Sequence, residues 1–181
     1  MKHDLAELTE EIALAVVTGI NSKIDAILNI PKTVRGDSKI NGIALDIAPW
    51  MPSLSLSIRI TDDWPMGKFR YSCADWHYGY FIDLMASESG VRASAKFSEI
   101  YENTDCADLR VGAHLIFHSA AEALLDHTVA GALQGAGLNA PKLGAEFPTP
   151  IFEYIVIDPD QGIPANYVDI VLSNRISKEA N

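Results

Sequence analysis

The run SLSLSIRIT (residues 53–61) shows the most regular alternation of apolar and polar side chains in the chain. Leucine or isoleucine stands at every even position, and serine, arginine or threonine stands at every odd one. A period of two places all the apolar side chains on one face of an extended strand. The run therefore predicts a strand of an antiparallel sheet, with a buried apolar face and a solvated face that carries hydroxyl groups and Arg59.

Two further strands are predicted beside this run, so that residues 40–83 make up most of the sheet. Isoleucine and leucine alternate with small or polar residues in a strand predicted over 40–50, and Pro49 and Pro52 on either side of Trp50 and Met51 indicate a turn. A third strand begins at residues 69–72 and ends in the segment DWHYGYF (75–81), which we call the aromatic cluster. The alternation in this cluster does not separate a solvated face from a buried one.

Helices are predicted before and after these strands in the sequence. Apolar residues spaced three or four apart predict a long helix over 4–28, which Pro31 should end, because proline disfavours helical geometry in the residue before it. A second helix is expected over 91–102. A third, over 106–134, is apolar on two nearly opposite faces, so we expect it to be central and covered on two sides.

The last part of the chain predicts two more strands, over 152–158 and 167–172, separated by a turn that contains proline and glycine. Strands and helices are thus segregated along the sequence. This order predicts a single α+β domain over 1–181. Its sheet should be mainly antiparallel, with about five strands, and should pack against the long N-terminal helix and the central apolar helix.

Composition narrows the classes of function. The chain has 181 residues and a formal net charge of −10, which disfavours contact with the phosphates of nucleic acid. No uncharged apolar run is long enough for a signal peptide or a membrane span, so we expect neither membrane contact nor secretion. Two cysteines do not make a disulfide framework, and a cytoplasmic location follows. No nucleotide-binding motif is present, and no cofactor is expected.

The aromatic cluster is the first candidate site, and two interpretations are open. Exposed aromatic side chains next to charges are typical of protein-binding hot spots. Alternatively, the same side chains fill the core beneath the first helix. A catalytic variant uses Cys73, Asp75 and His77, which share one face of a strand and would form a nucleophile, an orienting group and a base.

The third predicted helix carries the second candidate, His114, His118 and Glu122, at successive spacings of four. Residues four apart lie above one another on a helix, so two imidazoles and a carboxylate could face one metal ion. The stripe drifts around the helix, however, and the sequence lacks the glutamate that follows the first histidine in zinc proteases. The alternative is a half-exposed polar stripe between two apolar faces.

The order of elements resembles a family of small bacterial proteins, some of which are encoded beside polymorphic toxins and are taken to be immunity proteins. The resemblance rests on the strand that ends in Asp63, the motif Asp75-Trp76-His77-Tyr78, and the strand that ends in Ile157-Asp158. It implies a non-enzymatic module that covers the active site of a basic protein such as a toxin, and it supplies no catalytic residues. The expected partner-binding residues are acidic and aromatic: Asp62, Asp63, Trp64, Asp75, Trp76, Tyr78 and Tyr80.

Two alternatives to this function remain open. One is a metal-dependent or cysteine-type enzyme that uses either of the two candidate sets, the cysteine set or the histidine stripe. The other is a structural protein that forms a homo-oligomer by burying exposed leucine or tryptophan surface against its own copy. A metal analysis would test the metal-dependent version of the enzyme, and light scattering would test the homo-oligomer.

Overall fold

The computed structural model describes residues 5–33, 39–51, 53–61, 76–102, 109–138, 152–158 and 165–179. Two helices come first, followed by a run of three strands and a short 3-10 helix: α1 (Leu5–Ser22), α2 (Ile24–Thr33), β1 (Ile40–Ala48), β2 (Ser53–Ile60), β3 (Tyr78–Asp83) and η4 (Leu84–Ala86). Three helices, one strand and a last helix follow: α3 (Glu88–Glu102), α4 (Leu109–Leu124), α5 (His127–Gly135), β4 (Glu153–Val156) and α6 (Tyr167–Glu179).

In the described residues the strands form one four-stranded sheet in the order β3-β2-β1-β4. β2 pairs antiparallel with both β1 and β3, whereas β4 pairs parallel with β1. The α+β class is confirmed, but the prediction of about five mainly antiparallel strands is wrong, because the sheet is mixed and has four. β4 can return parallel to β1 because the helices between β3 and β4 supply the long crossover that parallel pairing requires.

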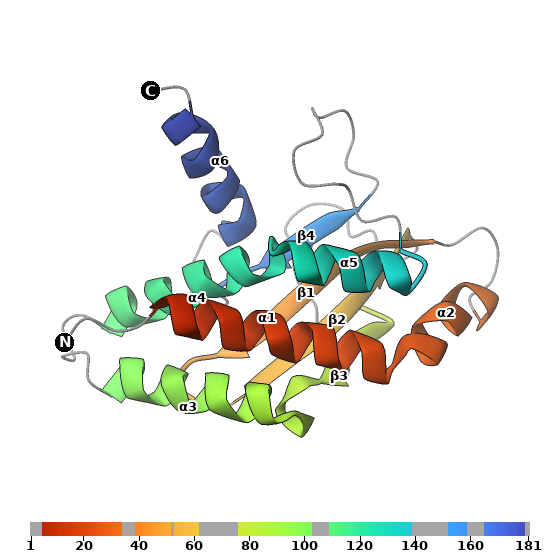
Figure 1. Cartoon of the computed structure of the whole chain (residues 1–181), viewed down its shortest axis with the longest axis horizontal. Helices are drawn as coiled ribbons and strands as arrows, with labels where there is room; N and C mark the ends of the chain where they lie inside the picture. Colours follow the sequence, from red (N-terminus) through yellow and green to blue (C-terminus); the bar gives the residue numbers. More distant parts are fainter. Residues whose placement is uncertain are drawn as a thin grey trace.

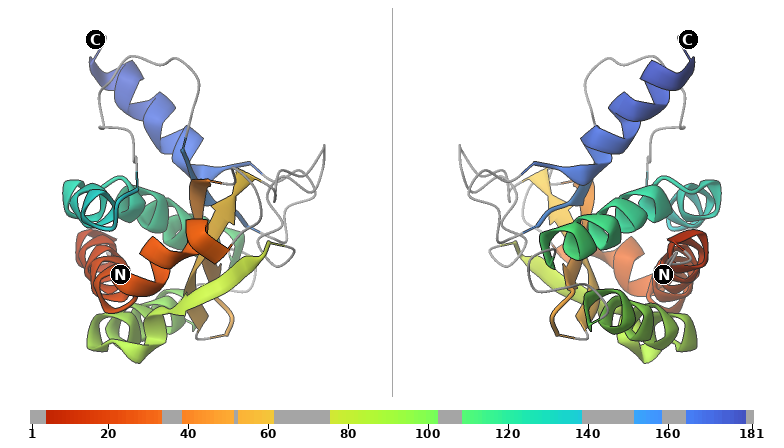
Figure 2. Two further views of the ribbon diagram at one scale, coloured as in Figure 1. Left: turned by 90° about the vertical axis from the view of Figure 1, so that its right-hand side faces the viewer. Right: turned by 90° about the vertical axis from the view of Figure 1, so that its left-hand side faces the viewer.

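The helices α1, α3, α4 and α5 cover one face of the sheet (Figures 1 and 2). α1 contacts α3 on one side and α4 and α5 on the other. The predicted alternation in β1 and β2 is confirmed, since Leu45 lies opposite Leu56 and both are buried in the core beneath these helices. Within the described residues, no helix is both long enough and apolar enough to cross a membrane.

The first and third predicted helices are each divided in two. A turn at Lys23 separates α1 from α2, and α2 continues past Pro31, where we expected an end, to Thr33. The third breaks at Asp126, whose carboxylate accepts a hydrogen bond from the Thr128 amide at 2.8 Å and so starts α5. Of the two predicted apolar faces, the one with Ile116 and Phe117 is buried, whereas Val111 of the opposite face is 54% exposed, so the expected cover on both sides is only partly found.

The predicted strand over 167–172 is wrong, because this segment is the first half of α6. Its β-branched residues favour a strand locally. In the structure, however, Tyr167, Val168 and Val171 are buried together, and a spacing of three to four residues is that of one helical face. Tertiary packing has overridden the local preference for strand.

Candidate functional site

The face of the sheet turned away from the helices is polar, but it is not solvated. Its side chains come from the odd positions of β2 and the even positions of β1: Ser55, Ser57, Arg59, Gly42, Ala44 and Asp46. Ser57 and Arg59 are 0% and 1% exposed. Trp76 packs here with Ala44 and Ile155, and its ring centroid lies 5.9 Å from the guanidinium carbon of Arg59. The sequence predicted a solvated face, whereas the structure buries Ser57 and Arg59 and packs Trp76 on this face.

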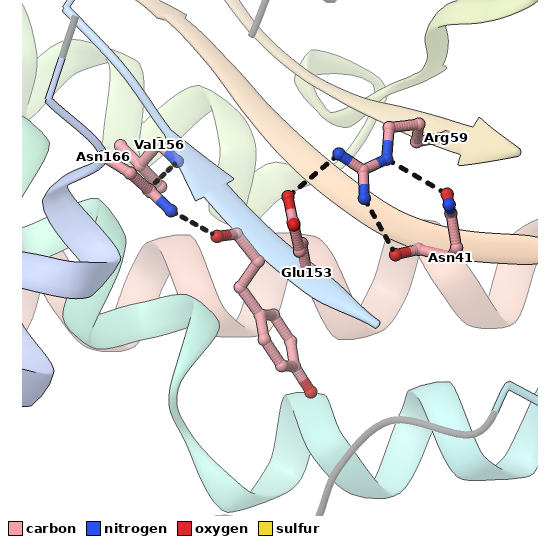
Figure 3. Close-up of polar contacts among 6 residues, drawn as sticks. Asn41, Arg59, Glu153, Val156 and Asn166 are labelled. Carbon is pink, nitrogen blue, oxygen red and sulfur yellow. Dashed lines mark hydrogen bonds and ion pairs between the residues drawn. The ribbon is translucent and has the colours of Figure 1, made fainter. Parts of the chain in front are cut away.

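Arg59 is the centre of a buried polar cluster on this face (Figure 3). Its Nη1 lies 2.9 Å from Oε2 of Glu153, and its Nε donates to Oδ1 of Asn41 at 3.0 Å. Nη2 donates to the backbone oxygen of Asn41 at 3.3 Å. Since all three guanidinium nitrogens donate, the cost of burying the charge is offset by good hydrogen bonds.

Gly42 allows this cluster to form. It lies between Arg59 on β2 and Glu153 on β4, in one row across the three strands. A Cβ atom at this position would lie 2.9 Å from the backbone oxygen of Glu153 and 3.4 Å from Nε of Arg59. With no side chain there, the guanidinium can pass over β1 to reach β4. The cluster is therefore a structural tie that holds the short parallel strand at the edge of the sheet.

A second polar chain on the same face fixes the backbone of β3. The Tyr80 amide donates to Oγ of Ser57 at 2.8 Å, and Ser57 donates to Oδ2 of Asp46 at 2.5 Å. Tyr80 has φ = 50°, the left-handed region, and it lies where the β2–β3 register shifts between Leu56 and Ile58. The third strand therefore contains a β-bulge, which explains why its alternation could not be read from the sequence.

The bulge gives the aromatic side chains of β3 different environments. Tyr78 and Phe81 both pack against the core and meet edge to face, with ring centroids 5.4 Å apart. Tyr80, between them, is 59% exposed. The aromatic cluster is thus neither wholly core nor wholly surface.

The predicted partner-binding residues do not share one environment. Trp76 is buried, on the face of the sheet opposite α1 and not beneath it, and Tyr78 is half-buried. Tyr80 is the exposed aromatic residue among the described members of the set. The remaining members lie outside the described residues: Asp62, Asp63, Trp64 and Asp75. Cys73 of the catalytic variant also lies outside them, and its His77 is exposed.

The histidine stripe of α4 is the place where α6 packs. Nδ1 of His114 is 3.2 Å from the Tyr167 hydroxyl, and Glu122 forms an ion pair with Arg175. The rings of His114 and His118 are 6.3 Å apart. Among the described residues, no three His, Cys, Asp or Glu side chains are grouped so that they could hold a metal ion.

Some buried polar atoms in the described part of the chain have no hydrogen-bond partner, among them Oγ of Ser55, Nε1 of Trp76 and the hydroxyl of Tyr154. The first two belong to the polar face of the sheet. The third lies in the helix-covered core, where burial raises the pKa of Tyr154 to about 12. An orphaned buried polar group destabilises a fold by about 1–3 kcal/mol, so these atoms are places where substitution can increase stability.

Sequence reasoning missed the Arg59 cluster and the role of Ser57. One signal was available for Arg59: it is the one charged residue in the alternating run over 53–60. Its partner Glu153 lies 94 positions away in the sequence, and no local pattern joins the two.

No protein-family model, curated protein or solved structure matches this chain. The resemblance to toxin-associated immunity proteins rests on short motifs, some of which fall outside the described residues. It stays a prediction, and the described geometry that bears on function is that of Tyr80, Ser57 and their neighbours.

Proposed function

We propose that this protein is a non-enzymatic protein-binding module whose contact surface is centred on Tyr80. The observation that carries the proposal is the backbone of this residue: a tyrosine at φ = 50° with 59% of its surface exposed. The left-handed region costs a residue with a Cβ atom about 1–2 kcal/mol. Strain of this kind persists where the surroundings impose it, and it gathers at functional sites.

The surroundings of Tyr80 fix its backbone. The buried hydroxyl of Ser57 accepts its amide hydrogen, and the aromatic neighbours Tyr78 and Phe81 are packed into the core. An anchor that is already fixed loses little conformational entropy when it binds. Tyrosine also supplies a large contact area with few rotatable bonds, which is why it is enriched in binding hot spots.

The charge of the chain favours a basic partner. The formal net charge is −10, and three aspartates of the predicted set precede Tyr80 within 18 positions of the sequence: Asp62, Asp63 and Asp75. Complementary charge accelerates association and selects against acidic partners. A toxin with a basic active site, such as a nuclease, fits this description, and the function is then that of an immunity protein in the bacterial cytoplasm. A neighbouring gene for a large secreted toxin would support this version.

Affinity capture with a matched pair of variants tests the proposal. Tyr80→Gly removes the aromatic ring. The backbone can keep its conformation without strain, because glycine adopts positive φ readily. Val91→Ala is the control, since it removes an apolar side chain that is 52% exposed on α3, in the helix layer. Wild type and Val91→Ala should capture the same basic protein at low salt, and Tyr80→Gly should not. Capture of that protein by all three, or of no basic protein by the wild type, would contradict the proposal.

A further inference from the structure

The side chain of Asn166 binds the outer edge of β4 (Figure 3). Its Nδ2 donates to the backbone oxygen of Tyr154 at 2.8 Å, and its Oδ1 accepts from the Val156 amide at 3.0 Å. Asn166 is only 8% exposed. β4 is the last strand on this side of the described sheet, so without Asn166 these two backbone groups would face away from the ladder.

The pattern of these two bonds is that of a parallel strand. In a parallel ladder, one residue donates to the carbonyl before its opposite residue and accepts from the amide after it. The side-chain amide of Asn166 does both around Ile155. A single side chain therefore stands in for one residue of a fifth, parallel strand.

The same side chain starts α6. Oδ1 of Asn166 also lies 3.3 Å from the Val168 amide, and the backbone oxygen of Asn166 accepts from the Asp169 amide at 3.1 Å. Asn166 is thus the N-cap of α6 as well as the cap of the strand edge. Because one oxygen atom serves both, movement of α6 away from the domain also withdraws the cap from β4.

The attachment of α6 is restricted to its first half. Tyr167, Val168 and Val171 are buried, while residues 173–177 are all exposed. Beyond the buried half, an ion pair joins Arg175 of α6 to Glu122 of α4, and both side chains are partly exposed. Figure 1 shows α6 leaning away from the other helices. A helix that is buried along only half of its length opens at a lower free energy than the core does.

We propose that α6 is a latch over the edge of β4. When α6 is docked, Asn166 closes the edge; when α6 is released, the edge can bind an extended polypeptide segment in parallel register. Strand addition of this type uses backbone hydrogen bonds, so it accepts peptides of varied sequence. This binding site lies on β4, at the opposite end of the strand order from Tyr80, and it does not depend on the function proposed for that residue.

Hydrogen exchange on the full chain tests the coupling. Arg175→Glu places a like charge beside Glu122 and leaves Asn166 untouched. The exchange rates of the α6 amides and of the Val156 amide should rise by the same factor, about tenfold or more, with the β1–β2 ladder unchanged. Arg110→Glu, the same charge reversal at an exposed position of α4, is the control. It should leave the exchange rates of the α6 amides, the Val156 amide and the β1–β2 ladder unchanged. The latch proposal would be contradicted if, in Arg175→Glu, the α6 amides exchange faster while the Val156 amide stays protected. It would also be contradicted if neither exchange rate changes.

Asn166→Asp tests the edge separately from the helix. Aspartate remains a good N-cap, but it has no N–H to donate to the Tyr154 oxygen. A synthetic peptide of residues 40–48, the strand that already pairs in parallel with β4, is the probe. It should bind Asn166→Asp more tightly than the wild type, because the carboxylate leaves the Tyr154 oxygen without a donor, whereas a peptide with proline in place of Leu45 should not bind. Absence of binding by the first peptide, or equal binding by both, would refute strand addition.

Discussion

The guanidinium of Arg59 and the carboxylate of Glu153 meet at 2.9 Å across an intervening strand. The pair joins β2 to β4, while β1 passes between them at Gly42. Both side chains are largely buried, at 1% and 10% exposure. The four-residue strand β4 thus has a side-chain tie to the centre of the sheet in addition to its ladder with β1.

Removing one member of this pair should lower the free energy of unfolding far more than replacing both members with apolar residues. Arg59→Met leaves a buried carboxylate without its partner, and breaking a buried pair in this way costs about 3–5 kcal/mol of unfolding free energy. Arg59→Met combined with Glu153→Leu should be destabilised by less than the sum of the single variants. Urea unfolding of the wild type, the two single variants and the double variant measures this difference. Additive losses would show that the two side chains do not act as a pair.

Gly42→Ala should destabilise the fold although the change adds one methyl group. Its Cβ atom would lie 2.9 Å from the Glu153 backbone oxygen, so β4 must shift, and overpacking of this type costs about 1–3 kcal/mol. Gly131→Ala in α5 is the matched control, since nothing lies within 4 Å of its added Cβ atom. That variant should gain about 0.5–1 kcal/mol from helix propensity. Thermal unfolding should move the two variants in opposite directions from the wild type.

Tyr154→Phe should keep or increase stability at neutral pH. The hydroxyl is buried without a partner, so removing it relieves a desolvation penalty of about 1–3 kcal/mol at the expense of a small gap. Leu133→Ala, which truncates a buried apolar side chain of α5, should instead cost about 2–5 kcal/mol. A loss of more than about 1 kcal/mol in Tyr154→Phe would mean that the hydroxyl makes a favourable contact.

The same variant should change the alkaline limb of the stability curve. Burial raises the pKa of Tyr154 to about 12, above the value of about 10 in an unfolded chain. The folded state then holds this proton more tightly, so the stabilisation is complete below about pH 10 and is lost as the pH rises towards about 12. Wild type should therefore lose stability more steeply than Tyr154→Phe between these two values. Parallel curves of stability against pH for the two proteins would contradict the raised pKa of Tyr154.

The strained backbone of Tyr80 predicts the order of two substitutions. Tyr80→Gly should be more stable than Tyr80→Ala by about 1 kcal/mol, because alanine retains the Cβ atom that opposes positive φ. Ser57→Ala should cost more than either, since it removes the acceptor of the Tyr80 amide and the donor to Asp46. Denaturant midpoints measured under one condition give the comparison. Equal stability of Tyr80→Gly and Tyr80→Ala would argue against strain at this position.

Elements whose pattern is local were predicted from the sequence. The strand over 53–60 and the buried face of α1 follow from local apolar spacing, and both are confirmed, although the hydroxyl-bearing face of the strand is buried as well. The prediction of a strand over 167–172 was wrong because the β-branched residues of this segment favour a strand locally. Its helical structure is stabilised by packing against α4 and by the N-cap at Asn166. The parallel pairing of β4 could not be predicted, since it depends on distant partners.

The candidate site was predictable only in part, for the same reason. An aromatic cluster is visible in the sequence, and Tyr80 was in the predicted set. Which aromatic side chain is exposed depends on a β-bulge, and that bulge depends on Ser57, which lies 23 residues earlier on another strand. Trp76 is buried against Ala44 and Ile155, which are distant in the sequence, on the other face of the sheet.

The affinity of Tyr80→Gly for the captured basic partner, measured by calorimetry against the wild type, tests most directly whether Tyr80 is the centre of a binding surface. A hot-spot residue costs about 2 kcal/mol or more when it is truncated. We therefore predict a Kd at least about 30-fold weaker for Tyr80→Gly. Val91→Ala should keep the wild-type Kd, and all affinities should fall with salt. An unchanged Kd for a correctly folded Tyr80→Gly would contradict the proposed role of this residue.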